Sequence, residues 1–239
     1  MPICWMCEKQ EATTGEHIFK HSILKEMYGR GRLAKGNRLI VRMEKTHSGG
    51  ITSSKTPIDS TNSDIFKFKK SLCALCNGGK SRAWDDEFDY LMRYLFENRK
   101  LLYSKKILNI NNIRPKNSKN GAHNLYCYFC KLLGCLLFTH NQAIPKEIKK
   151  ALCGFNYSNH LGINIVFAEN LKDIAEPKDF LVNHDLVGDA SDEINYRWAL
   201  GFGDIKLGFW FKTPKRFVIG DLWYGKSKRI PITCTSLDI

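Results

Sequence analysis

The sequence predicts an α+β fold, in which a zinc-bound N-terminal core is followed by helices and a small β-rich C-terminal region. Three observations predict this fold. Two Cys-x-x-Cys pairs occur in the first 80 residues, apolar residues recur at helical spacing between residues 84 and 139, and short aromatic and β-branched runs follow residue 160. We therefore expect three parts: a core over 1–103, a basic linker with helices over 104–159, and the β-rich region over 160–239.

The first helix is predicted over residues 84–96, where apolar side chains form a single helical stripe. Acidic residues fill its first turns and basic residues its end, as the helix dipole favours. Two further helices are predicted over 122–139 and 145–153. The stripe consists of Trp84, Phe88, Leu91, Met92, Leu95 and Phe96.

Strands are predicted where β-branched and aromatic residues form short runs between Gly, Pro and Asp. One run, "NRLIVRM", lies early in the chain, whereas the Ser/Thr/Gly-rich stretch after it and the basic stretch over 104–122 are predicted to be a loop and an exposed linker or arm. The predicted strands cover 37–43, 163–168, 194–202, 206–212 and 216–224.

Composition indicates a folded protein, with 43% hydrophobic and 12% aromatic residues. The start of the chain lacks the pattern of a secretory signal, and the apolar run over 125–138 is shorter than the ~20 residues that span a bilayer. We therefore expect a cytoplasmic protein without a membrane partner. In that compartment, nine cysteines favour metal binding over a disulfide framework.

The net charge of +13 is concentrated in the first 150 residues. Residues 101–150 alone hold nine Lys and Arg against one Asp or Glu, whereas residues 151–239 hold ten against eleven. A polyanionic partner explains this distribution, and so does a surface kept soluble by like charge. The charge alone leaves both interpretations open.

Cys4 and Cys7 form one Cys-x-x-Cys pair, and Cys73 and Cys76 form another. Two such pairs are the usual ligands of a structural Cys4 zinc, which holds distant parts of a chain together. A third pair, Cys127 and Cys130, lies in an apolar helix with no further pair after it. We interpret this third pair as core thiols.

Two short motifs flank the predicted zinc site. Glu16-His17-Ile18 follows the first Cys pair, and the second pair runs directly into Asn77-Gly-Gly-Lys80. Over residues 1–100 this pattern resembles the HNH, or ββα-metal, nuclease family. In that family an Asp/Glu-His-Ile stretch ends the first strand, and a Cys-x-x-Cys-Asn stretch opens the helix.

The resemblance implies a role for each matching residue. His17 matches the general base that takes a proton from the attacking water. Glu16 and Asn77 match the oxygen ligands of one catalytic Mg²⁺ or Mn²⁺, a type of ion that is bound by few protein oxygens and several waters. Lys80 and Arg82, at the start of the helix, are placed to contact phosphate.

The sequence departs from the family pattern at two positions. Many members carry a middle Asn nine residues before the final one, where this chain has Phe68. Either another group braces His17 or the site is weakened. Glu16 is one methylene longer than the commoner Asp. We interpret His21, four residues after His17, as a surface or supporting residue.

Basic residues outside the motifs are further candidates for contacts with a nucleic-acid backbone. The alternative is that they are solvated surface residues. One group lies in the loop after His21, and another lies in the predicted linker. The first group comprises Arg30, Arg32, Lys35, Arg38, Arg42 and Lys45, and the second comprises Lys105, Lys106, Arg114, Lys116 and Lys119.

These observations predict a metal-dependent endonuclease that hydrolyses phosphodiester bonds in double-stranded DNA. Restriction or phage defence suits such a protein by analogy, and the β-rich region is expected to serve specificity, regulation or homodimerisation. One alternative is a non-catalytic, zinc-stabilised nucleic-acid-binding module. Another is a protein–protein adaptor that uses its cysteines for stability alone.

Overall fold

The structure is a computed structural model of the 239-residue chain. The described residues are 2–28, 39–45, 51–57, 60–61, 63–114, 120–154, 160–168, 180–189, 195–212 and 221–235.

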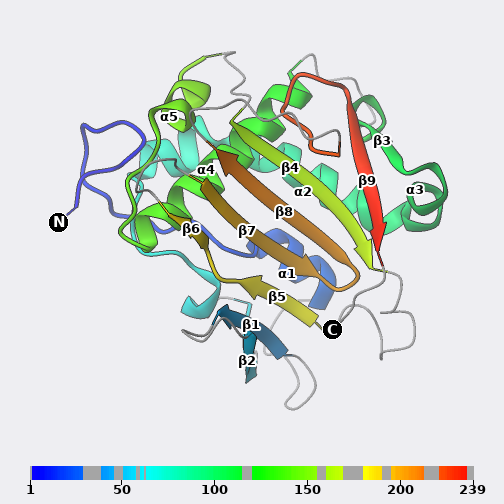
Figure 1. The fold of residues 1–239 in the computed structure, drawn as a ribbon. Coiled ribbons are helices and arrows are strands. Elements are labelled where there is room, and N and C mark those ends of the chain that lie inside the picture. Colours follow the sequence, from blue (N-terminus) through cyan, green and yellow to red (C-terminus); the bar gives the residue numbers. More distant parts are fainter. Residues whose placement is uncertain are drawn as a thin grey trace.

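The described residues form a mixed α+β structure, as the sequence predicts (Figure 1). The α-helices are α1 (His21–Tyr28), α2 (Arg82–Glu97), α3 (Arg99–Lys105), α4 (Gly121–Thr139) and α5 (Lys146–Leu152). Short 3₁₀ turns cover Asp64–Phe66 and Ile110–Asn112, and a π-helix covers Leu75–Lys80. The strands are β1 (Leu39–Lys45), β2 (Ile51–Pro57), β3 (Ile107–Asn109), β4 (Leu161–Ala168), β5 (Phe180–His184), β6 (Val187–Asp189), β7 (Asn195–Phe202), β8 (Ile205–Lys212) and β9 (Arg229–Thr235).

One sheet contains all of these strands, in the order β2-β1-β5-β7-β8-β4-β9-β3, with β6 pairing with β7 at the side. Most neighbours are antiparallel, but β1 runs parallel to β5 and β4 runs parallel to β9. The sheet draws strands from all three of the parts expected from the sequence. These parts therefore share one sheet and one hydrophobic core.

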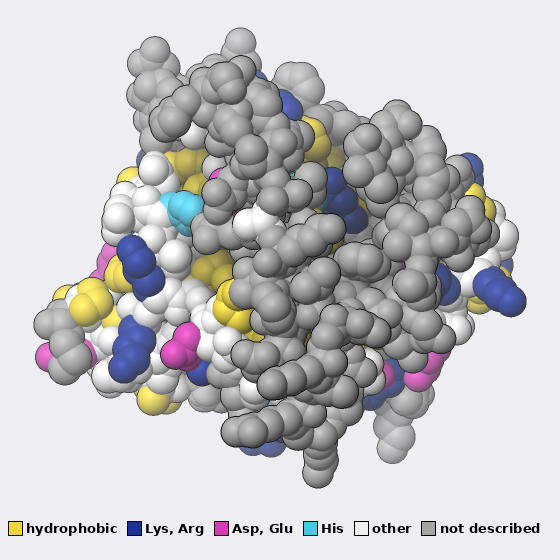
Figure 2. Space-filling view, turned by 90° about the horizontal axis from the view of Figure 1, so that it is seen from below, with side chains coloured by type: hydrophobic (Ala, Val, Ile, Leu, Met, Phe, Trp, Pro, Cys, Tyr) yellow, Lys and Arg dark blue, Asp and Glu magenta, His cyan; other side chains and the backbone are white. Residues whose placement is uncertain are grey.

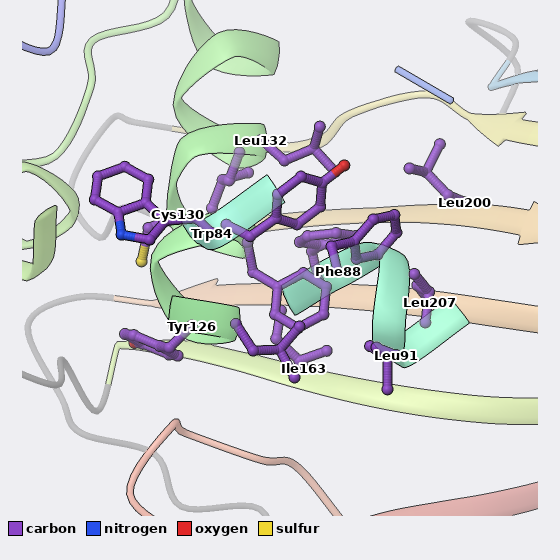
Figure 3. Close-up of a cluster of buried hydrophobic side chains, with 14 of the residues drawn as sticks. Trp84, Phe88, Leu91, Tyr126, Cys130, Leu132, Ile163, Leu200 and Leu207 are labelled. Atoms are coloured by element: carbon purple, nitrogen blue, oxygen red, sulfur yellow. The ribbon is translucent and has the colours of Figure 1, made fainter. Parts of the chain in front are cut away.

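Helices α2 and α4 lie side by side across one face of the sheet (Figure 1). The predicted stripe of α2 is buried except for Phe96, which is partly buried, and Phe88 of the stripe packs against α4. Helix α4 is buried nearly all round, because it lies between α2 and the strands. Aromatic and aliphatic side chains from both helices and from β4, β7 and β8 fill the space between the layers (Figure 3).

The predicted helices over 84–96, 122–139 and 145–153 are confirmed as α2, α4 and α5. The strand predictions over 37–43, 163–168, 194–202 and 206–212 are confirmed as β1, β4, β7 and β8, apart from residues 37, 38 and 194, which lie outside the described residues.

The prediction of one strand over 216–224 is wrong in its described part. Residues 213–220 lie outside the described residues, and Trp223 forms only an isolated bridge with Ile163. The last strand among the described residues is instead β9. The sequence does not predict this strand, because it contains Pro231 and proline is uncommon in central strands.

Two stretches expected to be irregular contain strands. The Ser/Thr-rich stretch includes β2, which pairs with β1 at an edge of the sheet. The stretch over 104–122 is not simply an exposed linker, because it contains β3 and buries Leu108, Ile110 and Ile113. A few apolar residues among asparagines anchor this segment, and sequence periodicity does not detect so short a pattern.

A short antiparallel ribbon precedes α2. Residues 13–18 pair with residues 66–72: the amide of Phe68 donates to the carbonyl of Glu16 (2.9 Å), and the amide of Ile18 donates to that of Phe66 (2.6 Å). At Gly15 an added Cβ would lie 2.5 Å from the carbonyl oxygen of Phe68, so this close approach requires glycine. The ribbon brings the first 20 residues beside the segment that leads into α2.

Candidate metal centre and surrounding site

The four predicted zinc ligands come together in the structure. The Sγ atoms of Cys4, Cys7, Cys73 and Cys76 all lie within 4.8 Å of one another, and the Cys7 and Cys73 sulfurs are 3.9 Å apart. A tetrahedral zinc with Zn–S bonds of about 2.3 Å requires sulfurs about 3.8 Å apart. The four cysteines are therefore positioned to bind a metal such as zinc.

Local backbone contacts shape both halves of this cluster. In the first half, the amide of Cys4 donates to the carbonyl of Gln10 (2.8 Å), and Glu8 adopts a left-handed conformation at φ 55° that turns the chain back. In the second half, the amide of Cys76 donates to the Sγ of Cys73 (3.4 Å). Amide donors around sulfur stabilise thiolates, which are the form that binds a metal.

The environment acts differently on the individual thiols. Backbone N–H groups of Lys9 and Gln10 lower the pKa of Cys7 to about 6. Burial raises the pKa of Cys4 and of Cys76 above the ordinary value. A bound divalent cation deprotonates its thiol ligands and so overcomes this effect of burial.

The first cysteine turn is fixed to helix α4 by Trp5. Its side chain is buried against Gly134, where an added Cβ would lie 2.4 Å from the indole ring. The amide of Trp5 also donates to the carbonyl of Ser71 (3.2 Å), just before the second cysteine pair. The metal centre is thereby attached to the helical layer as well as to the ribbon.

His17 lies at the end of the ribbon, where it forms a bridge with Lys67. Its half-buried ring stacks on that of His21, with centroids 5.8 Å apart, and Nε2 of His21 lies 3.2 Å from Oγ1 of Thr61. Burial lowers the pKa of His17 to about 4, and the positive charges of His21, Lys67 and Lys131 act in the same direction. The imidazole is therefore neutral at pH 7.

Glu16 is buried, and both of its carboxylate oxygens have partners. Oε1 accepts from the amide of His17 (3.1 Å), and Oε2 lies 2.7 Å from Nζ of Lys131. These contacts differ from those of a carboxylate that faces an open metal site. Sequence analysis missed Lys131 as a partner, although a lysine inside an apolar helix signals that acidic groups lie nearby.

Asn77 lies within the π-helix that follows the second cysteine pair. Its amide donates to the carbonyl of Cys73 (3.0 Å), and its own carbonyl accepts from Oγ of Ser81 (2.7 Å). The side-chain Oδ1 is buried and has no hydrogen-bond partner among the described residues. A buried amide oxygen without a partner is costly, and a bound cation is one group that satisfies it.

Phe68, at the position of the family's middle Asn, is a core residue. It is 4% exposed and packs against Trp198, with ring centroids 6.0 Å apart. The segment that carries His17 is held instead by the backbone pairing of the ribbon and by the stacked ring of His21. His21 thus lies beside His17, and its supporting role stays a prediction.

The candidate phosphate-binding residues have different surroundings. Lys80 and Arg82 are exposed at the start of α2, next to the open backbone of Gly78. Arg114 is engaged within the protein, because its Nε lies 3.2 Å from Glu87. The predictions for Arg30, Arg32, Lys35, Arg38, Lys116 and Lys119 lie outside the described residues, as do the side chains of Arg42 and Lys45.

Figure 2 shows one face of the molecule. On that face, Lys and Arg side chains lie in separate groups toward both sides, with Asp and Glu side chains among them. Lys105 and Lys106 are exposed at the end of α3.

Among the described helices, none is long and apolar enough to cross a membrane.

The third cysteine pair is part of the core, as predicted. Cys127 and Cys130 are fully buried in α4, and burial raises the pKa of Cys127 to about 12. In the part of the chain that the structure describes, the cluster at Cys4, Cys7, Cys73 and Cys76 is the one group of three or more Cys, His, Asp or Glu side chains close enough to hold a metal.

No protein-family model matches this chain, and neither a curated protein nor a solved structure is similar to it. The resemblance to HNH nucleases therefore rests on the short motifs of residues 1–100.

Proposed function

We propose that this protein is a metal-dependent endonuclease of the HNH type that acts on DNA. The observation that carries the proposal is the buried Oδ1 of Asn77, which has no hydrogen-bond partner among the described residues. Cys73 and Cys76, just before Asn77, meet Cys4 and Cys7 of the first turn, and the chain continues from that turn to Glu16 and His17. The antiparallel ribbon before α2 supports the same arrangement.

In this proposal His17 is the general base. A neutral imidazole accepts the proton of a water molecule at its unprotonated ring nitrogen, and the water oxygen then attacks phosphorus. The stacked ring of His21 and the backbone pairing of the ribbon hold the imidazole in place. Exposed Lys80 and Arg82 bind the phosphate backbone of the substrate.

Asn77 and Glu16 are the protein ligands of the proposed catalytic Mg²⁺ or Mn²⁺. The unpartnered Oδ1 of Asn77 fits this role directly. Glu16 contributes negative charge, and each of its oxygens keeps a lone pair beyond its present contact. Such a cation supplies charge stabilisation for the phosphoryl oxygens and for the leaving 3′ oxygen.

A second candidate function is a nucleic-acid-binding module that does not cleave. The pairing of Glu16 with Lys131 favours this candidate, because Lys131 already neutralises the carboxylate that would bind the catalytic metal. The four-cysteine cluster serves as a scaffold equally well in both functions.

Supercoiled plasmid incubated with Mg²⁺ or Mn²⁺, with and without EDTA, separates the two functions. We expect metal-dependent nicking that falls at least 100-fold in His17→Ala, since general-base catalysis contributes about 10²–10⁴-fold. His140→Ala, at an exposed histidine after α4, is the matched control and retains nicking.

Zinc content and the melting temperature, measured on each protein, show whether the His17 variant keeps its fold. DNA binding without a cut by the wild type would favour the module. Absence of any DNA binding at low salt would exclude both candidates.

A further inference from the structure

Lys131 is a charged residue in the middle of the most buried helix. It is 0% exposed, and its Nζ lies 2.7 Å from Oε2 of Glu16, 2.7 Å from Oδ1 of Asp85 and 3.2 Å from Oγ of Ser81. An ammonium group has three N–H donors. All three donors of Lys131 are therefore used, and each points to a different residue.

The three partners of Lys131 belong to the two segments that form the candidate site. Glu16 directly precedes His17, whereas Ser81 and Asp85 lie at the start of α2, just after Asn77. The Ser81 hydroxyl lies 2.7 Å from the carbonyl oxygen of Asn77 and 2.9 Å from Oδ2 of Asp85, and its single proton serves one of them at a time. One ammonium thus connects both segments.

Stability alone is a weak reason for this arrangement. Desolvating one ammonium and two carboxylates is expensive, and well-packed apolar side chains often stabilise a core at least as well. Tyr128 and Cys135 lie next to Lys131 on the same face of α4, and both are buried and uncharged. This part of the core is therefore otherwise packed with uncharged side chains. The charge therefore calls for a role at the site it connects.

We propose that Lys131 is a positioning residue for the candidate catalytic site. Its ammonium lies between the carboxylates of Glu16 and Asp85. It thereby fixes the position of the Glu16–His17 segment relative to Asn77 and the start of α2. This inference rests on the proposed function, because it assigns Lys131 to the same site. Lys131 itself contacts neither substrate nor metal in this role.

The test separates positioning from support of the fold. Lys131→Met leaves the buried carboxylate of Glu16 and the half-buried carboxylate of Asp85 without this cation, so the melting temperature falls. In Lys131→Met/Asp85→Asn one of these charges is removed, and the melting temperature recovers in part. In both variants Glu16 lacks its contact with Lys131. We therefore expect plasmid nicking at saturating Mn²⁺ to stay about 100-fold below wild type, because a displacement of about 1 Å in a catalytic site causes a loss of that size.

Mn²⁺ titration followed by electron paramagnetic resonance provides a readout that does not depend on cleavage. Binding is expected to weaken about tenfold or more in the double variant, since ligand positioning of this kind affects metal affinity 10–100-fold. Lys206→Met is the matched control, because it removes a half-buried lysine of β8, and it is expected to bind Mn²⁺ and nick plasmid as the wild type does.

Nicking and Mn²⁺ affinity that recover together with the melting temperature in the double variant would overturn the inference and assign Lys131 to the fold alone. Tighter Mn²⁺ binding in the double variant would also overturn it, because Lys131 would then be a competitor of the metal. A wild type that neither binds Mn²⁺ nor cleaves would refute the proposed function itself, and the positioning role with it.

Discussion

The chain contains the same Cys-x-x-Cys spacing in two very different regions. At the N-terminal cluster, Cys4 and Cys7 meet Cys73 and Cys76 across the ribbon, and their sulfurs face one another. In helix α4, Cys127 and Cys130 are fully buried in the hydrophobic core, where Sγ of Cys127 lies 3.4 Å from Nε2 of His123. The spacing alone therefore does not define a metal site. A metal site also requires a second cysteine pair that the fold brings close to the first.

The backbone around each pair explains the difference. In the cluster, turns present amide N–H groups to sulfur, and they lower the pKa of Cys7 to about 6. In α4, the amides are used by the helix itself, and burial raises the pKa of Cys127 to about 12 and that of Cys130 well above its ordinary value. Thiols in α4 stay protonated and behave as small apolar groups.

The largest effect that tests this comparison is expected from removal of a cluster ligand. Cys76→Ser, or prolonged treatment with a strong chelator, should release the metal and unfold the N-terminal part, because a structural zinc contributes on the order of 10 kcal/mol to its site. Metal content by mass spectrometry and unfolding by circular dichroism measure this. An unchanged melting temperature after complete loss of metal would contradict it.

A smaller effect is expected from the same type of change in α4. Cys130→Ala should reduce the free energy of unfolding by about 1–2 kcal/mol, as for a small cavity in a core. Metal content should stay the same as in the wild type. Cys153→Ala, at an exposed cysteine, is the control and should change neither quantity. Loss of metal from the Cys130 variant would show that the two regions are not independent.

A third effect, comparable in size to that of Cys130→Ala, concerns acid and a group outside both cysteine regions. Burial, with the charge of Lys206 acting in the same direction, lowers the pKa of His184 to about 4 in the folded protein, from 6.5. Between these values the unfolded chain binds the proton more tightly, so stability decreases as the pH falls from about 6.5 to about 4.

His184→Gln removes this contribution. The variant should lose less stability than the wild type between pH 7 and pH 5, as measured by urea unfolding in the presence of zinc. Equal losses in both proteins would assign the acid sensitivity to other groups: to His17, whose pKa burial also lowers to about 4, or to the cysteine cluster, whose thiolates release metal when they are protonated.

The sequence predicts those parts of the molecule that depend on local pattern. The stripe of α2, the apolar run of α4 and the two cysteine pairs all follow from spacing, and the structure contains them. The partners of Lys131 do not follow from spacing, because Glu16 and Asp85 approach it only after three separate elements have packed.

The sheet is predictable only in part for the same reason. Strands β7 and β8 are recognisable because they alternate or are rich in aromatic residues, and they pair with each other as a hairpin. Strands β3 and β9 are short or contain proline, and they become strands through long-range pairing: β3 pairs with β9, and β9 pairs with both β3 and β4. The HNH nuclease activity stays a prediction from short motifs.

The connectivity of the sheet has a consequence for the order in which a nascent chain acquires structure. All four sulfur ligands have been synthesised once residue 76 is complete, so a metal can be captured while most of the protein is still untranslated. Strand β3 and one edge of β4 must wait for β9, and the edge of β1 that does not pair with β2 must wait for β5. The metal centre can therefore organise early, whereas closure of the sheet is a late, long-range event that leaves unpaired strand edges exposed during translation.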